Sequence, residues 1–277
     1  MSLDPSVLTT RGQTVTSAPS FIDRHYLLIR RLHSFSGIFP IGLFLIPHLT
    51  TNSSIVWGRI GGHGGGVAAG VETFQHEVNF IHSLPALLLI EIFGLWLPLA
   101  FHAILGVYFA RSGRVNVKRY AYQGNWRYTW QRITGYIAFV FVFMHVASLR
   151  WGWTFWGLMP TFDPEYAASS TAIHFQDGAW GTFVSAFYLV GVLSIVFHFA
   201  NGLWTAAITW GLTVSATAQT RWGYACFGLG MGLAAAAVTA IYGFSTLDPV
   251  EAEKVERKML TTPVTETDLA MTRKDGA

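Results

Sequence analysis

The chain has 277 residues, of which 52% are hydrophobic and only 12% are charged, and its formal net charge is +3. Soluble domains carry about 25% charged residues, so this composition excludes an ordinary soluble enzyme and predicts a membrane protein. The basic residues are not interleaved with a solvated face, which argues against a nucleic-acid partner. The single cysteine excludes an internal disulfide, an iron–sulfur cluster held by this chain alone and a covalently attached c-type haem.

Five apolar runs follow one another along the chain, and each is long enough to cross a bilayer as a helix of about 20 residues. They cover approximately residues 32–49, 84–110, 133–149, 180–212 and 224–244. We therefore predict an all-α transmembrane fold, a five-helix bundle that occupies residues 30–245.

The segments that flank or connect these runs are more polar. Residues 1–29 form a polar N-terminal segment without the apolar stretch of a cleavable signal peptide. We expect residues 50–82 to form a long connection, in which the sequence GGHGGG at positions 61–66 is a flexible loop. Residues 246–277 are charged, with both signs mixed, and we expect them to form a mobile tail.

Lysine and arginine residues predict the orientation of the bundle. With five spans, the N-terminus, the second connection and the fourth connection share one side, and that side holds eleven Lys and Arg residues. The other side holds Arg59 and Arg150 in its connections, plus five cations in the C-terminal tail. Because cytoplasmic connections carry the excess of Lys and Arg, we expect the N-terminus in the cytoplasm and the C-terminus outside.

Four of the five runs carry one histidine deep among apolar residues, where an imidazole needs a partner. At about 1.5 Å of rise per residue, His48 lies roughly 27 Å and His145 roughly 20 Å from the inner edge, both in the outer half. His102 lies roughly 13 Å from that edge, and His198 lies roughly 30 Å along a run that travels inward. The depth count therefore pairs His48 with His145 and His102 with His198.

Two imidazole pairs at different depths favour two bis-histidine haems, because each haem iron takes one axial ligand on each face of the ring. A single intramembrane histidine is more often a hydrogen-bonded packing residue or a proton relay than a ligand. Four histidines in successive helices, paired by depth, favour ligation. A proton relay would need several acids, and only Glu91 lies within a span. A haemless transporter or scaffold is the alternative from a different class of function.

At these residues the chain resembles the cytochrome b membrane-anchor subunit of succinate dehydrogenase and fumarate reductase, of the single-subunit, five-helix, two-haem kind. The matching stretches are RRLHSFSGIFPIGLFLIPHL at Arg30–Leu49, SLPALLLIEIFGLWLPLAFHAILGVY at Ser83–Tyr108, NWRYTWQRITGYIAFVFVFMHV at Asn125–Val146 and LVGVLSIVFHFANGLWTAAITWGLTV at Leu189–Val214. The resemblance covers about residues 25–245. A dihaem cytochrome b of another quinone-linked dehydrogenase is a second redox interpretation, and these stretches argue against it.

The resemblance implies that His48, His102, His145 and His198 are the axial ligands of two haem b groups. It implies that electrons pass from an iron–sulfur subunit through the inner and outer haems to a membrane quinone, typically menaquinone, near the outer side. The resemblance also implies that a flavoprotein subunit binds the dicarboxylate and that this chain is the quinone-reactive subunit of the enzyme. The cofactors of this chain are then expected to supply its redox chemistry. Both partner subunits are expected on the cytoplasmic face of a bacterial inner membrane.

Three residues are candidates for proton exchange with the quinone. Where the family has a carboxylate just before the sequence SLP, this chain has His82, whose imidazole titrates near neutrality. Glu77 lies on the same connection, and Glu91 lies in the outer half of the second run. The alternatives are a hydrated loop histidine at His82 and, at Glu91, a protonated acid that bonds a neighbouring helix.

Four residues near the inner edge are candidates to bind the propionates of the inner haem, since cations and amides suit carboxylates: Arg31, His33, Gln131 and Arg132. For His33 the alternative is a bond to the backbone, and for the arginines it is anchoring at the lipid headgroups. Asn201 is expected to bond a neighbouring helix. Four other histidines are expected on the surface: His25, His63, His76 and His174.

Overall fold

The computed structural model describes residues 21–62, 64–112, 123–159 and 161–261. All regular secondary structure in these residues is helical, which confirms the all-α prediction. The first 20 residues of the polar N-terminal segment, residues 113–122 of the second connection and residues 262–277 of the predicted tail lie outside the described residues.

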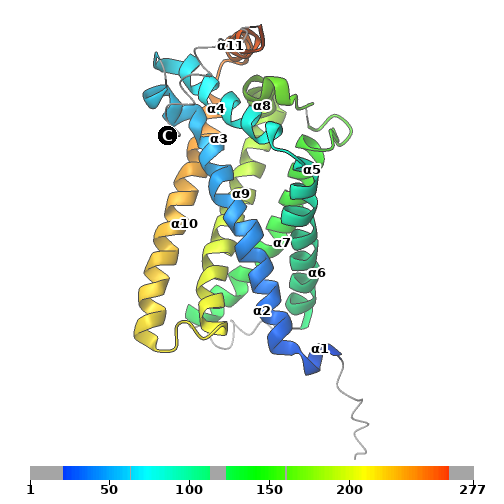
Figure 1. Ribbon diagram of the computed structural model, residues 1–277, viewed down its shortest axis with the longest axis vertical. Helices are drawn as coiled ribbons and strands as arrows, with labels where there is room; N and C mark the ends of the chain where they lie inside the picture. Colours follow the sequence, from blue (N-terminus) through cyan, green and yellow to red (C-terminus); the bar gives the residue numbers. More distant parts are fainter. Residues whose placement is uncertain (1–20, 63, 113–122, 160, 262–277) are drawn as a thin grey trace, which may run out of the picture.

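Within the described residues, five helical segments are long and apolar enough to cross a membrane, as predicted. They run approximately side by side along the long axis of the molecule (Figure 1). The five segments are Tyr26–Gly61, Leu87–Ser112, Asn125–Leu149, Trp180–Thr209 and Ala216–Ser245. The first begins four residues before the expected boundary at residue 30, and the short helix α1 (Phe21–Arg24) precedes it.

The first two spans each contain a π-helical segment beside a proline. The first span consists of α2 (Tyr26–Ser36), η2 (Gly37–Gly42) and α3 (Leu43–Gly61), and Pro40 lies inside η2. The second span consists of α5 (Leu87–Ile90), η3 (Glu91–Trp96) and α6 (Leu97–Ser112), and Pro98 lies just after η3. Proline has no N–H to donate in the i→i−4 hydrogen bond of an α-helix. The backbone therefore changes locally to the wider π-helical hydrogen-bond pattern, and the helix continues.

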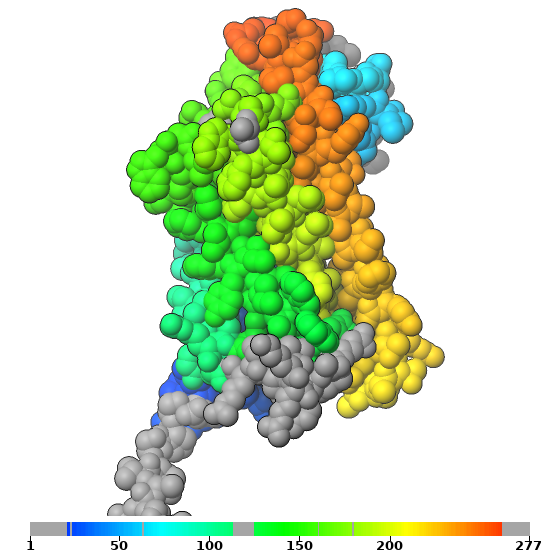
Figure 2. Space-filling view, turned by 180° about the vertical axis from the view of Figure 1, so that it is seen from behind, coloured from blue at the N-terminus to red at the C-terminus, as the bar shows by residue number. Residues whose placement is uncertain are grey.

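The other three spans are continuous helices. They are α7 (Gln123–Leu149), α9 (Gly178–Thr209) and α10 (Ala216–Ser245). Figure 2 shows α7 and α9 on the back of the molecule, with α10 along one edge.

Most of the expected long connection over residues 50–82 is helical. Helix α3 continues to Gly61 with Gly62 as its C-cap, and α4 (Gly66–Ser83), with Gly65 as its N-cap, packs against α3. The two helices approach closely at glycine: a Cβ added to Gly70 would lie 2.5 Å from the Ile55 carbonyl oxygen. The segment is helical because two amphipathic helices pack closely against each other. Hydropathy alone does not detect amphipathic helices.

The tail is also more ordered than expected, because residues 249–261 form a helix. Helix α11 (Pro249–Thr261) packs against α4 and against α8 (Ala167–Gln176), which follows the short 3-10 helix η4 (Pro164–Tyr166). We call α4, α8 and α11 the helical cap. The cap lies at the end of the bundle where α9 begins and α10 ends (Figure 1).

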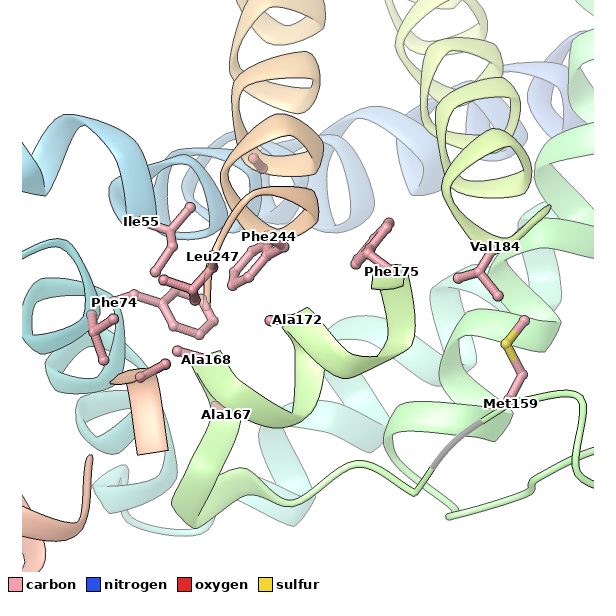
Figure 3. Packing of buried hydrophobic residues seen from close by; sticks show 13 residues of the cluster. Ile55, Phe74, Met159, Ala167, Ala168, Ala172, Phe175, Val184, Phe244 and Leu247 are labelled. Carbon is pink, nitrogen blue, oxygen red and sulfur yellow. The ribbon is translucent and has the colours of Figure 1, made fainter. Parts of the chain in front are cut away.

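The larger hydrophobic core of the described residues lies at the cap. In Figure 3, Phe74, Phe244 and Leu247 converge over the alanines of α8, and the rings of Phe74 and Phe244 meet edge to face at 5.1 Å. Burial of each large apolar side chain contributes about 1.5–3 kcal/mol. His174 is also buried here, with 2% of its surface exposed, so its predicted surface position is wrong. Its ring Nδ1 lies 2.9 Å from the Ser170 carbonyl oxygen within α8.

Candidate functional site

Two pairs of imidazoles lie inside the bundle. The rings of His102 on α6 and His198 on α9 have their centroids 6.0 Å apart and their planes at 86°. The rings of His48 on α3 and His145 on α7 have their centroids 5.9 Å apart and their planes at 80°. The structure therefore brings together the same two pairs that the depth count groups. Each pair joins two different spans.

The two pairs lie at different heights. A Cβ on Gly37 would touch the ring of His102, and His48 follows Gly37 by eleven positions. A Cβ on Gly135 would touch the ring of His198, and His145 follows Gly135 by ten positions. At about 1.5 Å per residue, both intervals place the pairs roughly 15 Å apart along the bundle. The His48–His145 pair is the one nearer the cap.

Backbone carbonyls fix the inner pair of rings. His102 Nδ1 lies 2.9 Å from the His33 carbonyl oxygen, and His198 Nδ1 lies 3.0 Å from the Gln131 carbonyl oxygen. A carbonyl oxygen only accepts, so each Nδ1 carries the proton and each Nε2 keeps a free lone pair. This tautomer is the one that a metal-ligating histidine needs when Nε2 is the ligand. In the other pair, His145 Nδ1 lies 3.2 Å from the Tyr188 hydroxyl.

Glycines make room for the inner rings. A Cβ at Gly37 would lie 2.4 Å from His102 Cε1, closer than real side-chain contacts allow. A Cβ at Gly135 would lie 3.0 Å from His198 Cε1. These two glycines thus serve a close approach between a backbone and an imidazole, a more specific role than ordinary helix packing.

His33 lies against the inner pair. Its ring stacks on that of His102 with centroids 4.1 Å apart and planes at 13°. Its Nδ1 is buried and has no hydrogen-bond partner among the described residues. The side chain therefore contacts a candidate ligand, while its backbone oxygen holds that ligand's Nδ1.

Gln131 and Asn201 form polar contacts between α7 and α9 beside His198. The Gln131 side-chain amide donates to the His198 carbonyl oxygen at 3.0 Å, and Asn201 donates to Gln131 Oε1 at 2.7 Å. Arg127 Nε donates to Asn201 Oδ1 at 2.8 Å. The expectation that Asn201 bonds a neighbouring helix is confirmed, and we call Arg127, Asn201 and Gln131 the α7–α9 clamp.

The two arginines proposed to bind a haem propionate, Arg31 and Arg132, have different surroundings. Arg132 donates to the carbonyl oxygens of Phe109 and Ala110, so it caps the C-terminal turn of α6. Arg31 lines a shallow groove with Leu32, Phe35 and Trp210. Two positions along a helix correspond to about 200° of rotation, so Arg31 faces away from the side of α2 that carries His33.

The three proton-exchange candidates do not form one cluster. Glu91 on η3 pairs with Arg150 just after α7, with Arg150 Nε 3.1 Å from Glu91 Oε1 and Nη2 3.0 Å from Oε2. His82 is exposed near the end of α4, with its Nδ1 2.9 Å from the Val78 carbonyl oxygen. Glu77 is half-buried on the same helix. The bidentate pair shows Glu91 facing a cation, where the sequence suggested a proton carrier or a protonated acid.

Sequence reasoning missed the partners Arg127, Arg150 and Tyr188. For Arg150 a signal was present, because depth counting places it just beyond the third run, in the outer region that also holds Glu91. Tyr188 and Arg127 depend on the rotation of α9 and α7, which spacing alone does not determine.

The two imidazole pairs fit a haem. In the described ranges, no three or more His, Cys, Asp or Glu side chains come together as a metal site. A metal–imidazole nitrogen bond is about 2 Å long, so two imidazoles on opposite sides of one metal have ring centres about 6 Å apart. The observed 5.9 and 6.0 Å agree with that spacing, and haem iron takes axial ligands on its two faces.

In the described residues, five apolar helices enclose two separated imidazole pairs, an arrangement that defines a multi-pass membrane protein. No family model matches the chain. The chain is 37% identical over 215 residues to the succinate dehydrogenase cytochrome b558 subunit of Bacillus subtilis (strain 168), a match that covers 78% of this chain and 95% of that protein. The chain therefore belongs to the family of succinate dehydrogenase cytochrome b558 subunits, the membrane-anchor subunits of the succinate dehydrogenase complex.

Proposed function

We propose that this chain is a dihaem cytochrome b that passes electrons between an iron–sulfur subunit and membrane quinone. The observation that carries the proposal is the geometry of the two imidazole pairs, with ring centroids about 6 Å apart on four different spans. The proposed dihaem domain covers residues 30–245. The B. subtilis relative is a cytochrome by name, which supports haem b as the cofactor.

The histidines are proposed to act as axial ligands. His102 and His198 hold the inner haem, and His48 and His145 hold the outer one. When bound, the haems supply one-electron redox chemistry. The protein fixes the imidazoles: the carbonyls of His33 and Gln131 hold the inner Nδ1 protons, which leaves Nε2 free to ligate.

The remaining inner-edge candidates divide by their contacts. His33 stays a proposed neighbour of the inner haem, since its ring stacks on His102. Arg132 and Gln131 already bond protein carbonyls, so a role toward a propionate requires their spare N–H groups. The position of Arg31 on the other side of α2 favours its alternative, anchoring at the membrane surface.

The iron–sulfur and flavoprotein subunits are proposed to bind at the end of the bundle opposite the cap, on the cytoplasmic side. Of the described Lys and Arg residues, this end carries Arg24, Arg30, Arg31, Arg111, Arg127, Arg132 and Arg221. The positive-inside rule then places the N-terminus in the cytoplasm and the cap outside. A reporter enzyme fused after residue 277 tests this: activity outside is expected, and activity in the cytoplasm would reject the orientation.

The quinone, with menaquinone as the proposed type, is expected near the outer pair. His82 is proposed to exchange protons with it, because its imidazole is exposed and carries both a proton donor and an acceptor nitrogen, and Glu77 and Glu91 are further candidates. Replacement of His82 by Ala should slow quinone reduction while the haem spectra stay intact. Unchanged quinone reduction would remove His82 from the mechanism.

Haem stoichiometry tests the proposed function directly. The purified full-length protein should give b-type bands in the reduced-minus-oxidised spectrum and about two haems per chain by pyridine haemochrome, the number expected for four axial imidazoles. His198→Ala should lower this ratio to about one and leave the His48–His145 haem bound. A wild-type protein that binds no haem would overturn the proposal, and co-purification with a flavoprotein separates it from other quinone-linked cytochromes.

A further inference from the structure

The α7–α9 clamp leads from a cation at the inner edge to a candidate haem ligand. Gln131 and His198 bond each other twice, since His198 Nδ1 donates to the Gln131 carbonyl oxygen and Gln131 Nε2 donates to the His198 carbonyl oxygen. A shift of α7 along α9 would break both bonds at once. The double contact therefore fixes the height of His198 relative to α7.

Asn201 orients the side chain of Gln131. Its Nδ2 lies 2.7 Å from Gln131 Oε1, and Asn201 is 4% exposed, so water does not compete for this bond. With Oε1 occupied as an acceptor, the Gln131 amide nitrogen points to the His198 carbonyl oxygen. A buried amide pair of this kind has two possible orientations unless a third group selects one.

Both ends of the chain select this orientation, because Arg127 can only donate and the His198 carbonyl oxygen can only accept. A guanidinium only donates, so its 2.8 Å contact requires that Asn201 present Oδ1 to Arg127 and Nδ2 to Gln131. The next two bonds then run in the same direction. Arg127 is itself held in place, with its guanidinium carbon 3.8 Å above the centroid of the Trp204 ring. Trp204 in turn donates to the Gln219 carbonyl oxygen at the start of α10.

We infer that Arg127 and Asn201 are positioning residues for the inner haem ligand His198. They complete the hydrogen-bond chain that holds Gln131 against the His198 carbonyl oxygen, and they do so without touching the His198 ring. The outer ligand His145 differs, because its Nδ1 contacts the Tyr188 hydroxyl, which can donate as well as accept and can rotate. The inference rests on the proposed function, because it assigns these residues a role toward a haem.

The main test replaces Asn201 by Leu, a neutral residue of similar volume, in the full-length protein. Two haems per chain should remain, because the four imidazoles and their carbonyl partners are unchanged. One of the two low-spin ferric signals in the electron paramagnetic resonance spectrum should shift, together with one of the two steps of a redox titration. Thr209→Val is the matched control: Thr209 is half-buried on the same helix α9, and its hydroxyl bonds within its own helix, to the Thr205 carbonyl oxygen at 3.0 Å.

Two substitutions of Arg127 separate positioning from simple charge. Arg127→Lys keeps a donor-only cation but loses the planar stack on Trp204, so it should shift the signal less than Arg127→Gln, which should shift the same signal as Asn201→Leu. If the charge of Arg127 alone mattered, Arg127→Gln would shift the signal and Asn201→Leu would not, and the inference would be wrong. Unchanged signals in both variants, or equal shifts of both haems, would also overturn it. A wild-type protein without haem would instead reject the proposed function itself.

Discussion

The hydrogen-bond partner of one imidazole nitrogen decides whether the other nitrogen keeps a lone pair that can bind a metal. His102 and His198 each give the Nδ1 proton to a backbone carbonyl of a neighbouring span, so helix packing decides which nitrogen stays free. Loss of the hydrogen-bond partner of a metal-ligating histidine typically lowers metal affinity or activity by about 10–100-fold. Since the acceptors here are backbone atoms, side-chain replacement does not remove them directly. The inner site is therefore sensitive to the position of α2 and α7 rather than to one partner side chain.

Gly37→Ala tests how much the inner site depends on close packing. The new methyl group would lie 2.4 Å from His102 Cε1, so the imidazole or the helix must move. We expect the ratio of haem to protein to fall from about two towards one, with loss of the inner haem, because overpacking of this kind costs about 1–3 kcal/mol. Pyridine haemochrome and redox titration of the purified protein measure the loss.

Gly228→Ala is the matched control for this substitution. Gly228 lies within the transmembrane helix α10, and a Cβ there would have no heavy atom within 4 Å. The variant should keep two haems and unchanged stability, or gain up to about 1 kcal/mol from the better helix former. If Gly37→Ala retained both haems with wild-type spectra, the glycine would not be needed for the approach of His102.

At this scale the sequence predicts the histidine pairs but few of their neighbours. Depth follows from counting residues along a helix, so pairing His48 with His145 needed no knowledge of rotation. The side of a helix on which a residue lies is harder to predict, because each π-helical segment changes the rotation of all later residues in its span. The stacking of His33 on His102 and the turning away of Arg31 both depend on how their helix is rotated.

Among the helices, hydropathy identifies the spans and misses the cap. The five spans are apolar over their whole length, so a sliding average detects them. Helices α4 and α11 are amphipathic and half polar, and α11 carries charges at most exposed positions. Helices α4 and α11 are ordered by their contacts with each other and with α8. From the sequence, these segments are expected only as connections or as part of the tail. Glycine and charge content indicated flexibility where tertiary packing produces helices.

One carboxylate joins α11 to α8. Glu256 on α11 is fully buried and accepts bonds from Ala168 N at 2.6 Å, Ser169 N at 3.2 Å and Ser169 Oγ at 2.6 Å. It therefore satisfies free backbone N–H groups at the start of α8, as an N-terminal cap does. Removal of the acceptor by Glu256→Ala should cost about 1–3 kcal/mol, because buried donors would lose their partner.

The docking of α11 should depend on pH through Glu256. The pKa of its carboxyl is raised from the ordinary 4.5, chiefly because burial disfavours the charged form, although bonds from Ser169 and Ala168 oppose the shift. A group whose pKa is higher in the folded state stabilises that state most below the ordinary pKa. This contribution is lost as the pH rises through the raised pKa. Docking should thus weaken as the pH increases from about 4.5.

Hydrogen exchange of the α11 amides, corrected for the intrinsic effect of pH, measures this dependence. Glu256→Gln should flatten the pH profile, since the amide does not titrate. Glu251→Gln is the control on the same helix: Glu251 is 61% exposed and pairs with Lys254, so the wild-type profile should persist. A Glu256→Gln profile that still changes with pH like the wild type would assign the effect to another group.

The whole molecule separates the proposed electron path from a second packed region. The imidazole pairs lie between the spans, where α6 has no buried residue along its 16 positions. The larger hydrophobic cluster instead gathers at the cap, from α3, α4, α8, α9, α10 and α11 (Figure 3). Ile55 on α3 and Phe244 on α10 belong to that cluster and also to spans. The cap therefore ties together the ends of α3, α9 and α10, and of these spans α3 and α9 carry histidines of the two pairs.

Truncation after Asp248, which removes α11, tests whether the two regions are independent. Helix α11 contacts α4, α8 and η4, whereas the histidine pairs are held by contacts among α2, α3, α6, α7 and α9. We expect the truncated protein to keep two haems per chain and wild-type ferric signals. Its thermal unfolding midpoint should fall, by about 2–4 °C for each kcal/mol that the cap loses. A calorimetric scan and a haem assay on the same preparation measure both quantities. Loss of the outer haem would show that the cap holds the His48–His145 pair in place, and an unchanged midpoint would show that α11 adds nothing to the stability of the spans.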